Sequence, residues 1–186
     1  TEGDNNTGIG AEALQAVTTG TNNTGVGQIA GYGITTGVSN TIIGSRSGVT
    51  LAAGSNNTSV GLENFLSGTG SDNVAIGTTA MRNLSTGEKN SVLGTEAGNN
   101  ITSGSGNTAI GYQAGKQLGS GSNNTAVGRQ ALSVGAGGSN NVGLGYQALK
   151  SNTGSNNIGI GLNALVLNTS GTNNVAVGAE ALDANT

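Results

Sequence analysis

Apolar residues recur along the chain at a fixed interval of 17 residues, shortened to 16 at two places. Each recurrence is a short phrase, shown cleanly by N-T-A-I-G at 107–111, in which larger and small residues alternate. The phrase ends in Gly, and the residue before this Gly is always Ile, Val or Leu. Such alternation is typical of a short β-strand, and a fixed period along the whole chain indicates a solenoid. The pattern predicts eleven coils with one strand each.

The first residue of every phrase is Asn. These residues are Asn6, Asn23, Asn40, Asn57, Asn73, Asn90, Asn107, Asn124, Asn141, Asn157 and Asn174. Identical amides stacked one coil apart, at about 4.8 Å, can hydrogen-bond to one another as a ladder. Because a buried amide without a partner costs about 1–3 kcal/mol, we expect the ladder to be continuous and to have a structural role.

We number the positions of each coil from the Gly that ends its phrase, taken as zero. The aliphatic position −1 is predicted to point into the coil, and position −3, Thr or Val in most coils, to share its face. Position −2 is mostly Gly, Ala or Ser, which suits close approach of identical chains. After the Gly, +2 is often Glu or Gln, +3 is usually Ala and +4 is often Leu. These helix-forming residues allow one helical turn per coil, as at 146–150.

Several features favour parallel stacking over an antiparallel meander. Asn-Gly, the strongest signal for a two-residue hairpin, is absent although both residues are abundant. A Gly closes the return side of most 17-residue coils at +10, and in the two 16-residue coils it comes at +9. The missing residue therefore falls in the loop before this Gly, and the strand is left whole. The Gly at position zero is expected at a left-handed or crowded corner that a Cβ would obstruct.

Composition and charge exclude several functions. Among 186 residues there are 36 Gly, no Cys and no His, and only 8% are charged, with a net charge of −3. We therefore predict no nucleic-acid partner, no thiolate or imidazole metal site, and no enzyme, because the commonest general base and thiol nucleophile are missing. No apolar run is long enough to cross a bilayer, so membrane insertion is not expected.

Four segments match the dinucleotide fingerprint G-x-G-x-x-G/A. They begin at Gly8, Gly25, Gly143 and Gly159. Because they recur at the solenoid spacing and no long helix follows, they are by-products of the repeat, and no cofactor is predicted.

The phrases N-T-A-I-G at 107–111 and N-N-T-A-V-G at 123–128 resemble the N-S-V-A-I-G repeats in the heads of YadA-like trimeric autotransporter adhesins. They are also similar to N-T-A-I-G-Y-Q-A-L repeats of phage tail fibres. The resemblance covers the strand part of all eleven coils, although Asn replaces Ser and each coil is longer. It implies a parallel β-roll, packing of three chains side by side, and an extracellular location at a cell surface or on a virion.

The sequence thus predicts an all-β protein: a parallel β-solenoid (β-roll or β-helix) of eleven 16–17-residue coils, homotrimeric, with residues 1–186 as a single repeat array. The array is expected to be an excerpt of a longer fibre protein. Its predicted function is that of a structural or adhesive fibre segment, the shaft or head of a surface adhesin or phage tail fibre. A repetitive polar face would bind cell-surface targets, glycan or protein, with Tyr112 and Tyr146 at +1 as the best-placed aromatic contacts.

The alternative is a monomeric solenoid that acts as a spacer or binds ice. An ice-binding surface needs a flat row of Thr, which Thr7, Thr24, Thr41 and Thr58 at −3 could supply. Two observations count against ice binding. Val or Ile replaces Thr in later coils, and −3 is predicted to share the inward face with −1.

Overall fold

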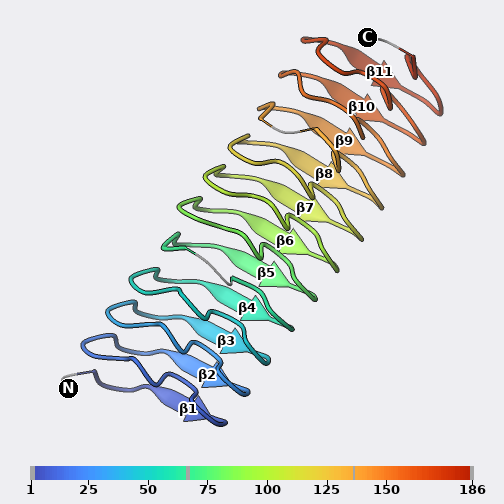
Figure 1. Cartoon of the computed structure of the whole chain (residues 1–186). Helices are drawn as coiled ribbons and strands as arrows, with labels where there is room; N and C mark the ends of the chain where they lie inside the picture. The colour runs from blue at the N-terminus through green and yellow to red at the C-terminus, as the bar shows by residue number, and fades with distance from the viewer. Residues whose placement is uncertain (1–2, 66–67, 136, 185–186) are drawn as a thin grey trace.

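The computed structural model describes residues 3–65, 68–135 and 137–184 and forms a rod of stacked coils (Figure 1). The two ends of the array predicted for 1–186 lie outside these ranges. Each coil contributes one strand of three residues. The strands are β1 (Thr7–Ile9), β2 (Thr24–Val26), β3 (Thr41–Ile43), β4 (Thr58–Val60), β5 (Val74–Ile76), β6 (Ser91–Leu93), β7 (Thr108–Ile110), β8 (Thr125–Val127), β9 (Val142–Leu144), β10 (Ile158–Ile160) and β11 (Val175–Val177).

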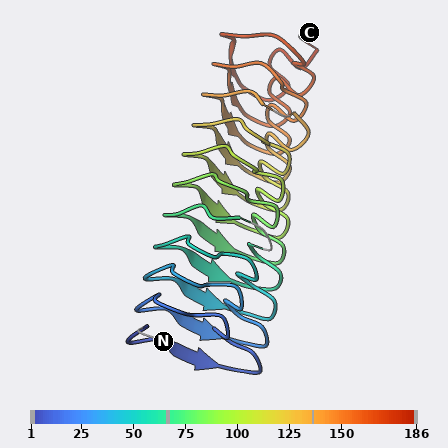
Figure 2. The same cartoon turned by 60° about the vertical axis from the view of Figure 1, so that its left-hand side comes forward.

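All eleven strands lie in one sheet, in chain order, and every neighbouring pair is parallel. The sheet runs the length of the rod, and the remainder of each coil returns behind it (Figure 2). Equivalent positions are paired throughout, including the short coils, where Thr58 pairs with Val74 and Val142 with Ile158. The parallel β-solenoid and the placement of both deletions outside the strand are confirmed.

The assignment of the inward face is wrong by one residue. In every strand except β1 the middle residue, position −2, is buried, whereas −3 and −1 are partly or fully exposed. Position −2 is small in nine of the eleven strands because the opposite wall fills the interior: a Cβ on Gly25 would lie 2.8 Å from Cγ of Leu14. The two exceptions, Ile42 and Val92, are buried in coils whose +4 residue is Gly. The small residues therefore serve packing inside the coil and not the approach of identical chains.

The core is built from the return segment. In most coils Ala at +3 is buried together with a larger residue at +4 or an aliphatic residue near +7, for example Ala114 with Leu118 and Ala131 with Leu132. Burial of each Leu or Ile side chain stabilises the fold by about 1.5–3 kcal/mol. Stacking of the coils extends this core along the rod axis.

The expected helical turn at +1 to +5 is not formed, and the described residues contain no helix. Gln147 and Leu149 have φ angles of 55° and 53°, in the left-handed region, so no run of helical residues exists. Their backbone N–H groups point in opposite directions along the rod: Gln147 donates to Arg129 O at 3.0 Å and Leu149 to Ala164 O at 2.9 Å. Backbone bonds between coils have replaced those within a helix.

The Gly at position zero forms a corner that only Gly can occupy. Gly111 has φ 127°, and a Cβ there would lie 2.8 Å from the carbonyl oxygen of Gly128 in the next coil. Gly10, Gly27 and Gly178 have φ angles within a few degrees of this value. Both expectations for this position, left-handed backbone and crowding, are confirmed.

Candidate functional site

The eleven Asn residues at −4 form a chain of hydrogen bonds inside the rod. Each Asn from Asn23 onward donates its backbone N–H to the Oδ1 of the Asn one coil earlier, at 2.9–3.0 Å. The side chain also closes its own coil: Asn107 Nδ2 donates to Gly121 O at 2.9 Å. All but the two terminal residues, Asn6 and Asn174, are buried. The ladder therefore links the coils and holds each one shut.

The two short coils change the ladder locally. At the other junctions the amide also donates to the preceding Asn, as Asn124 Nδ2 does to Asn107 Oδ1 at 3.1 Å. Asn73 Nδ2 donates instead to the carbonyl oxygens of Ser71 and Gly87, both at 3.0 Å, and Asn157 Nδ2 donates to Asn152 Oδ1 at 3.1 Å. Loss of one loop residue thus redirects one side-chain bond while the backbone bond survives.

Positions −3 and −1 of β1–β11 form what we call the outer sheet face. The −1 row is entirely aliphatic and consists of Ile9, Val26, Ile43, Val60, Ile76, Leu93, Ile110, Val127, Leu144, Ile160 and Val177. Leu93 and Ile110 are 47% and 40% exposed. These side chains form a continuous aliphatic row along one side of the rod, and exposed apolar patches mark sites of association.

The −3 row runs beside it on the same face. Its members are Thr7, Thr24, Thr41, Thr58, Val74, Ser91, Thr108, Thr125, Val142, Ile158 and Val175. The prediction that this row points inward is wrong, because −3 and −1 alternate with the buried −2. One of the two observations against ice binding is thereby removed, and the replacement of Thr in later coils remains.

Position +1 follows the Gly corner beside the outer sheet face, and three consecutive coils place Tyr112, Arg129 and Tyr146 there. The guanidinium carbon of Arg129 lies 5.8 Å from the ring centroid of Tyr112 and 5.6 Å from that of Tyr146. Both distances are within cation–π range. We call these residues the Tyr–Arg–Tyr stack; the rings are 44% and 38% exposed. The sequence singled out both tyrosines but not Arg129, although its shared +1 position was visible.

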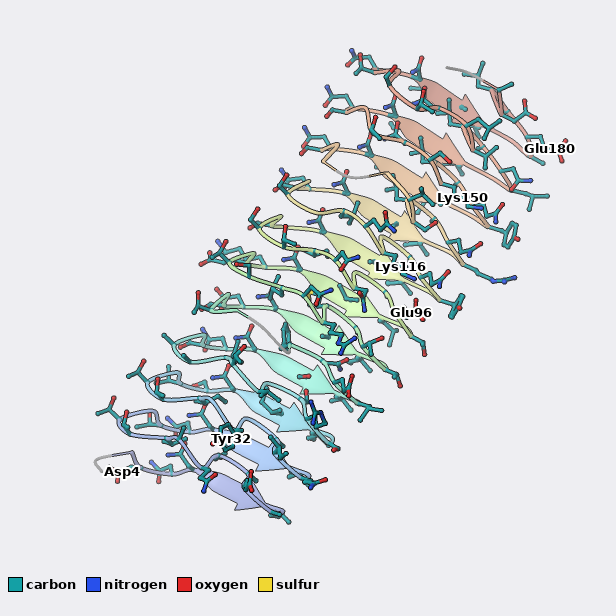
Figure 3. The ribbon with its side chains drawn as sticks, in the orientation of Figure 1. Asp4, Tyr32, Glu96, Lys116, Lys150 and Glu180 are labelled. Atoms are coloured by element: carbon teal, nitrogen blue, oxygen red, sulfur yellow. The ribbon has the colours of Figure 1, made fainter. Side chains whose placement is uncertain are left out.

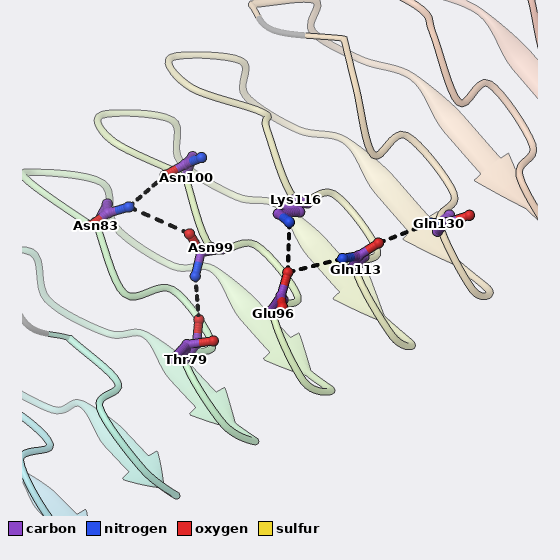
Figure 4. Close-up of polar contacts among 8 residues, drawn as sticks. All are labelled: Thr79, Asn83, Glu96, Asn99, Asn100, Gln113, Lys116 and Gln130. Carbon is purple, nitrogen blue, oxygen red and sulfur yellow. Dashed lines mark hydrogen bonds and ion pairs between the residues drawn. The ribbon is translucent and has the colours of Figure 1, made fainter.

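A second polar line follows the +2 positions (Figure 4). Gln113 Nε2 donates to Glu96 Oε2, Gln130 Nε2 to Gln113 Oε1, and Gln147 Nε2 to Gln130 Oε1, at 2.8–2.9 Å. Lys116 Nζ, from the coil of β7, donates to Glu96 Oε2 at 2.6 Å. The Lys116 hydrogen bond, followed by that of Gln113, lowers the pKa of Glu96 against a smaller opposing effect of burial. Glu96 therefore stays ionised and anchors one end of the line.

The described surface is otherwise smooth. In residues 3–65, 68–135 and 137–184 there is no pocket and no group of three or more Asp, Glu, His or Cys side chains placed to hold a metal ion. The same ranges contain no helix suited to crossing a membrane. The absence of an enzyme activity and of a cofactor stays a prediction from composition.

Among protein-family models, curated proteins and solved structures, none matches this chain. The similarity to trimeric adhesin heads and phage tail fibres consequently stays a prediction from the repeated phrase. The candidate sites are therefore defined by the geometry of the rod itself: the outer sheet face and the corner formed by +1 and +2.

Proposed function

We propose that the chain is a rod segment of an extracellular fibre, a surface adhesin or phage tail fibre, in which copies pack side by side through the outer sheet face. The supporting observation is the aliphatic row at −1, which extends over all eleven strands and is partly or fully exposed in each of them. The polar corner at +1 and +2 would remain on the outside of the fibre, where it can meet cell-surface targets. The function is thus structural and adhesive.

The geometry of the row explains why the partner is a second copy of the same chain. Strands in the sheet repeat at about 4.8 Å, so the aliphatic residues form a row with that spacing over roughly 50 Å. Only a surface with the same repeat can interlock with every residue of the row, and an identical rod has it. Three rods around one axis, as in the adhesin heads that the sequence resembles, would cover the row on each copy.

The oligomeric state tests this proposal. We expect size-exclusion chromatography with light scattering to give the mass of an elongated trimer for the native chain. Replacing both Ile76 and Ile110 with Lys is expected to give a folded monomer, because charge in the interface would be desolvated without a partner. A control with Lys at Thr86 and Gln117, both exposed in the return segment, has the same added charge and should remain trimeric.

A monomeric native chain at its highest soluble concentration would contradict the proposal. So would a double Lys variant that keeps the native mass. Circular dichroism on both variants distinguishes loss of association from loss of the fold.

Ice binding is the second candidate, and it is favoured by the outward position of six Thr residues in the −3 row. These are Thr7, Thr24, Thr41, Thr58, Thr108 and Thr125. Association of copies would cover this row, so the two functions use the same face in incompatible ways. A monomer that produces thermal hysteresis would establish ice binding, whereas a trimer without hysteresis would exclude it.

A further inference from the structure

We propose that the coils of β7–β9 carry a binding site for an acidic linear glycan, centred on the Tyr–Arg–Tyr stack. The inference deepens the proposed adhesive function by naming the ligand class. It rests on that function in one respect: positions +1 and +2 must remain on the outside of the fibre. The glycan would lie along the rod axis across +1 and +2. Sugar rings would pack on the tyrosines, and a carboxylate would meet Arg129.

The spacing of the stack suits a polymer. Tyr112 and Tyr146 are two coils apart, or about 9.6 Å along the rod at the usual strand spacing, which is close to the length of two pyranose rings in an extended chain. Arg129 lies midway between them. A glycan with one carboxylate on every second sugar would therefore match the order of the side chains along the rod. Its carboxylate would meet Arg129 while the sugar rings on either side would meet Tyr112 and Tyr146.

The charge distribution favours an acidic ligand. All nine acidic residues lie in 1–96 or 180–186, whereas residues 97–179 contain Lys116, Arg129 and Lys150 and no Asp or Glu. Figure 3 shows Lys116 and Lys150 projecting from the same side of the rod, two coils apart. Residues 97–179 therefore sum to +3 (three basic residues, no acidic ones) in a chain whose total is −3. Lys116 pairs with Glu96 of the preceding coil at 2.6 Å, whereas Arg129 and Lys150 form no ion pair with any described residue.

Arg129 differs from the other arginines in having no carboxylate partner. Arg46 and Arg82 both pair with Glu63, at 3.5 and 3.3 Å. The guanidinium of Arg129 contacts only the two tyrosine rings among the described residues. Cation–π contacts hold the guanidinium without using its N–H groups as hydrogen-bond donors. The guanidinium N–H groups, which can bind a carboxylate through two parallel hydrogen bonds, are thus positioned by the rings and remain available to a ligand.

The glutamine line beside the stack supplies the neutral contacts that a sugar needs. Each of Gln113, Gln130 and Gln147 uses one amide N–H in the line, and each amide has a second. These side chains are only partly buried, so the remaining donors can reach hydroxyl groups. The combination of few cations with many neutral polar groups fits an acidic glycan better than a nucleic acid, because affinity for a nucleic acid depends mainly on how many phosphates Lys and Arg neutralise.

Binding can be measured with three probes of similar length: a hyaluronan oligosaccharide, a neutral cello-oligosaccharide and a single-stranded DNA oligonucleotide. Calorimetry on the native chain is expected to show binding of hyaluronan, which has a carboxylate on alternate sugars, and little or none of the neutral glycan. Arg129→Gln should weaken hyaluronan binding about tenfold, the scale of one charge-assisted contact. The pair Tyr112→Ala and Tyr146→Ala should weaken it at least as much.

Matched controls come from the same chain. Tyr32→Ala removes a tyrosine with the same 38% exposure as Tyr146, and Arg82→Gln removes an arginine outside the stack; both should bind as the native chain does. Absence of hyaluronan binding, equal losses in the controls, or tighter binding of the oligonucleotide would each overturn the proposal. The titration is then repeated on the Ile76→Lys, Ile110→Lys variant, in which the Tyr–Arg–Tyr stack is unchanged. Hyaluronan binding by this variant would show that the glycan site does not depend on self-association.

Discussion

Asn107→Leu is expected to lower the melting temperature by about 6 °C or more. The substitution removes the amide that closes its coil on Gly121 O, and it removes the oxygen that accepts the backbone N–H and one side-chain N–H of Asn124. Three buried groups lose a hydrogen bond, and each costs about 1–3 kcal/mol, so the total is about 3–9 kcal/mol. In a chain of this size each kcal/mol shifts the melting temperature by about 2–4 °C. Differential scanning calorimetry measures the effect directly.

The matched control is Gln117→Leu. This change also converts an amide into Leu, but Gln117 is exposed and lies in the return segment. Its melting temperature should stay near that of the native chain. Equal stability of the two variants would show that the ladder contributes little and that the coils are held together by the apolar core alone. Since each coil contacts only its neighbours, the Asn107 variant is also expected to unfold less cooperatively.

Gly111→Ala is expected to destabilise the rod by about 2–6 kcal/mol. A residue with a side chain is strained by about 1–3 kcal/mol at the left-handed φ of 127°. In addition, the new Cβ would lie 2.8 Å from the carbonyl oxygen and 2.9 Å from the carbonyl carbon of Gly128. These are backbone atoms, so relief requires the two coils to separate, at about 1–3 kcal/mol for overpacking. Chemical denaturation gives the free energy of unfolding.

Gly137→Ala separates the two contributions. Gly137 also has a positive φ, 88°, but a Cβ there would have no atom within 4 Å. We expect only the backbone strain, and hence a smaller loss than in Gly111→Ala. If both variants lost the same free energy, the spacing between coils would have to be soft enough to accept the extra atom, and the crowding argument at position zero would fail.

Much of the fold could be predicted because the repeat itself carries it. The 17-residue period, the missing Asn-Gly and the intact strand in the short coils together indicate parallel stacking, and the strands pair as expected. The corner Gly could be predicted for the same reason. The helical turn at 146–150 could not, because helix propensity describes a segment by itself, whereas Gln147 and Leu149 direct their N–H groups to coils on opposite sides.

The candidate sites were less visible in the sequence. Tyr112 and Tyr146 stood out by type and position, but the contact with Arg129 depends on the coil spacing that brings consecutive +1 side chains within 6 Å. The outer sheet face was hidden by the assumption that aliphatic residues in an alternating strand point inward. That assumption holds for most half-buried strands and is wrong for Ile110, which is 40% exposed.

The number of coils, their register and the positions of the Asn ladder could all be read from the repeat, because each is a property of the period. The side of the strand that faces the interior became known only from the folded coil. Alternation places −3 and −1 together but does not say where they point. Where Leu at +4 fills the interior from the opposite wall, as Leu132 does, the −2 position has room only for a small residue such as Gly143, whereas the larger Ile42 at −2 occurs with Gly48 at +4. The larger aliphatic residues are therefore placed on the outer face.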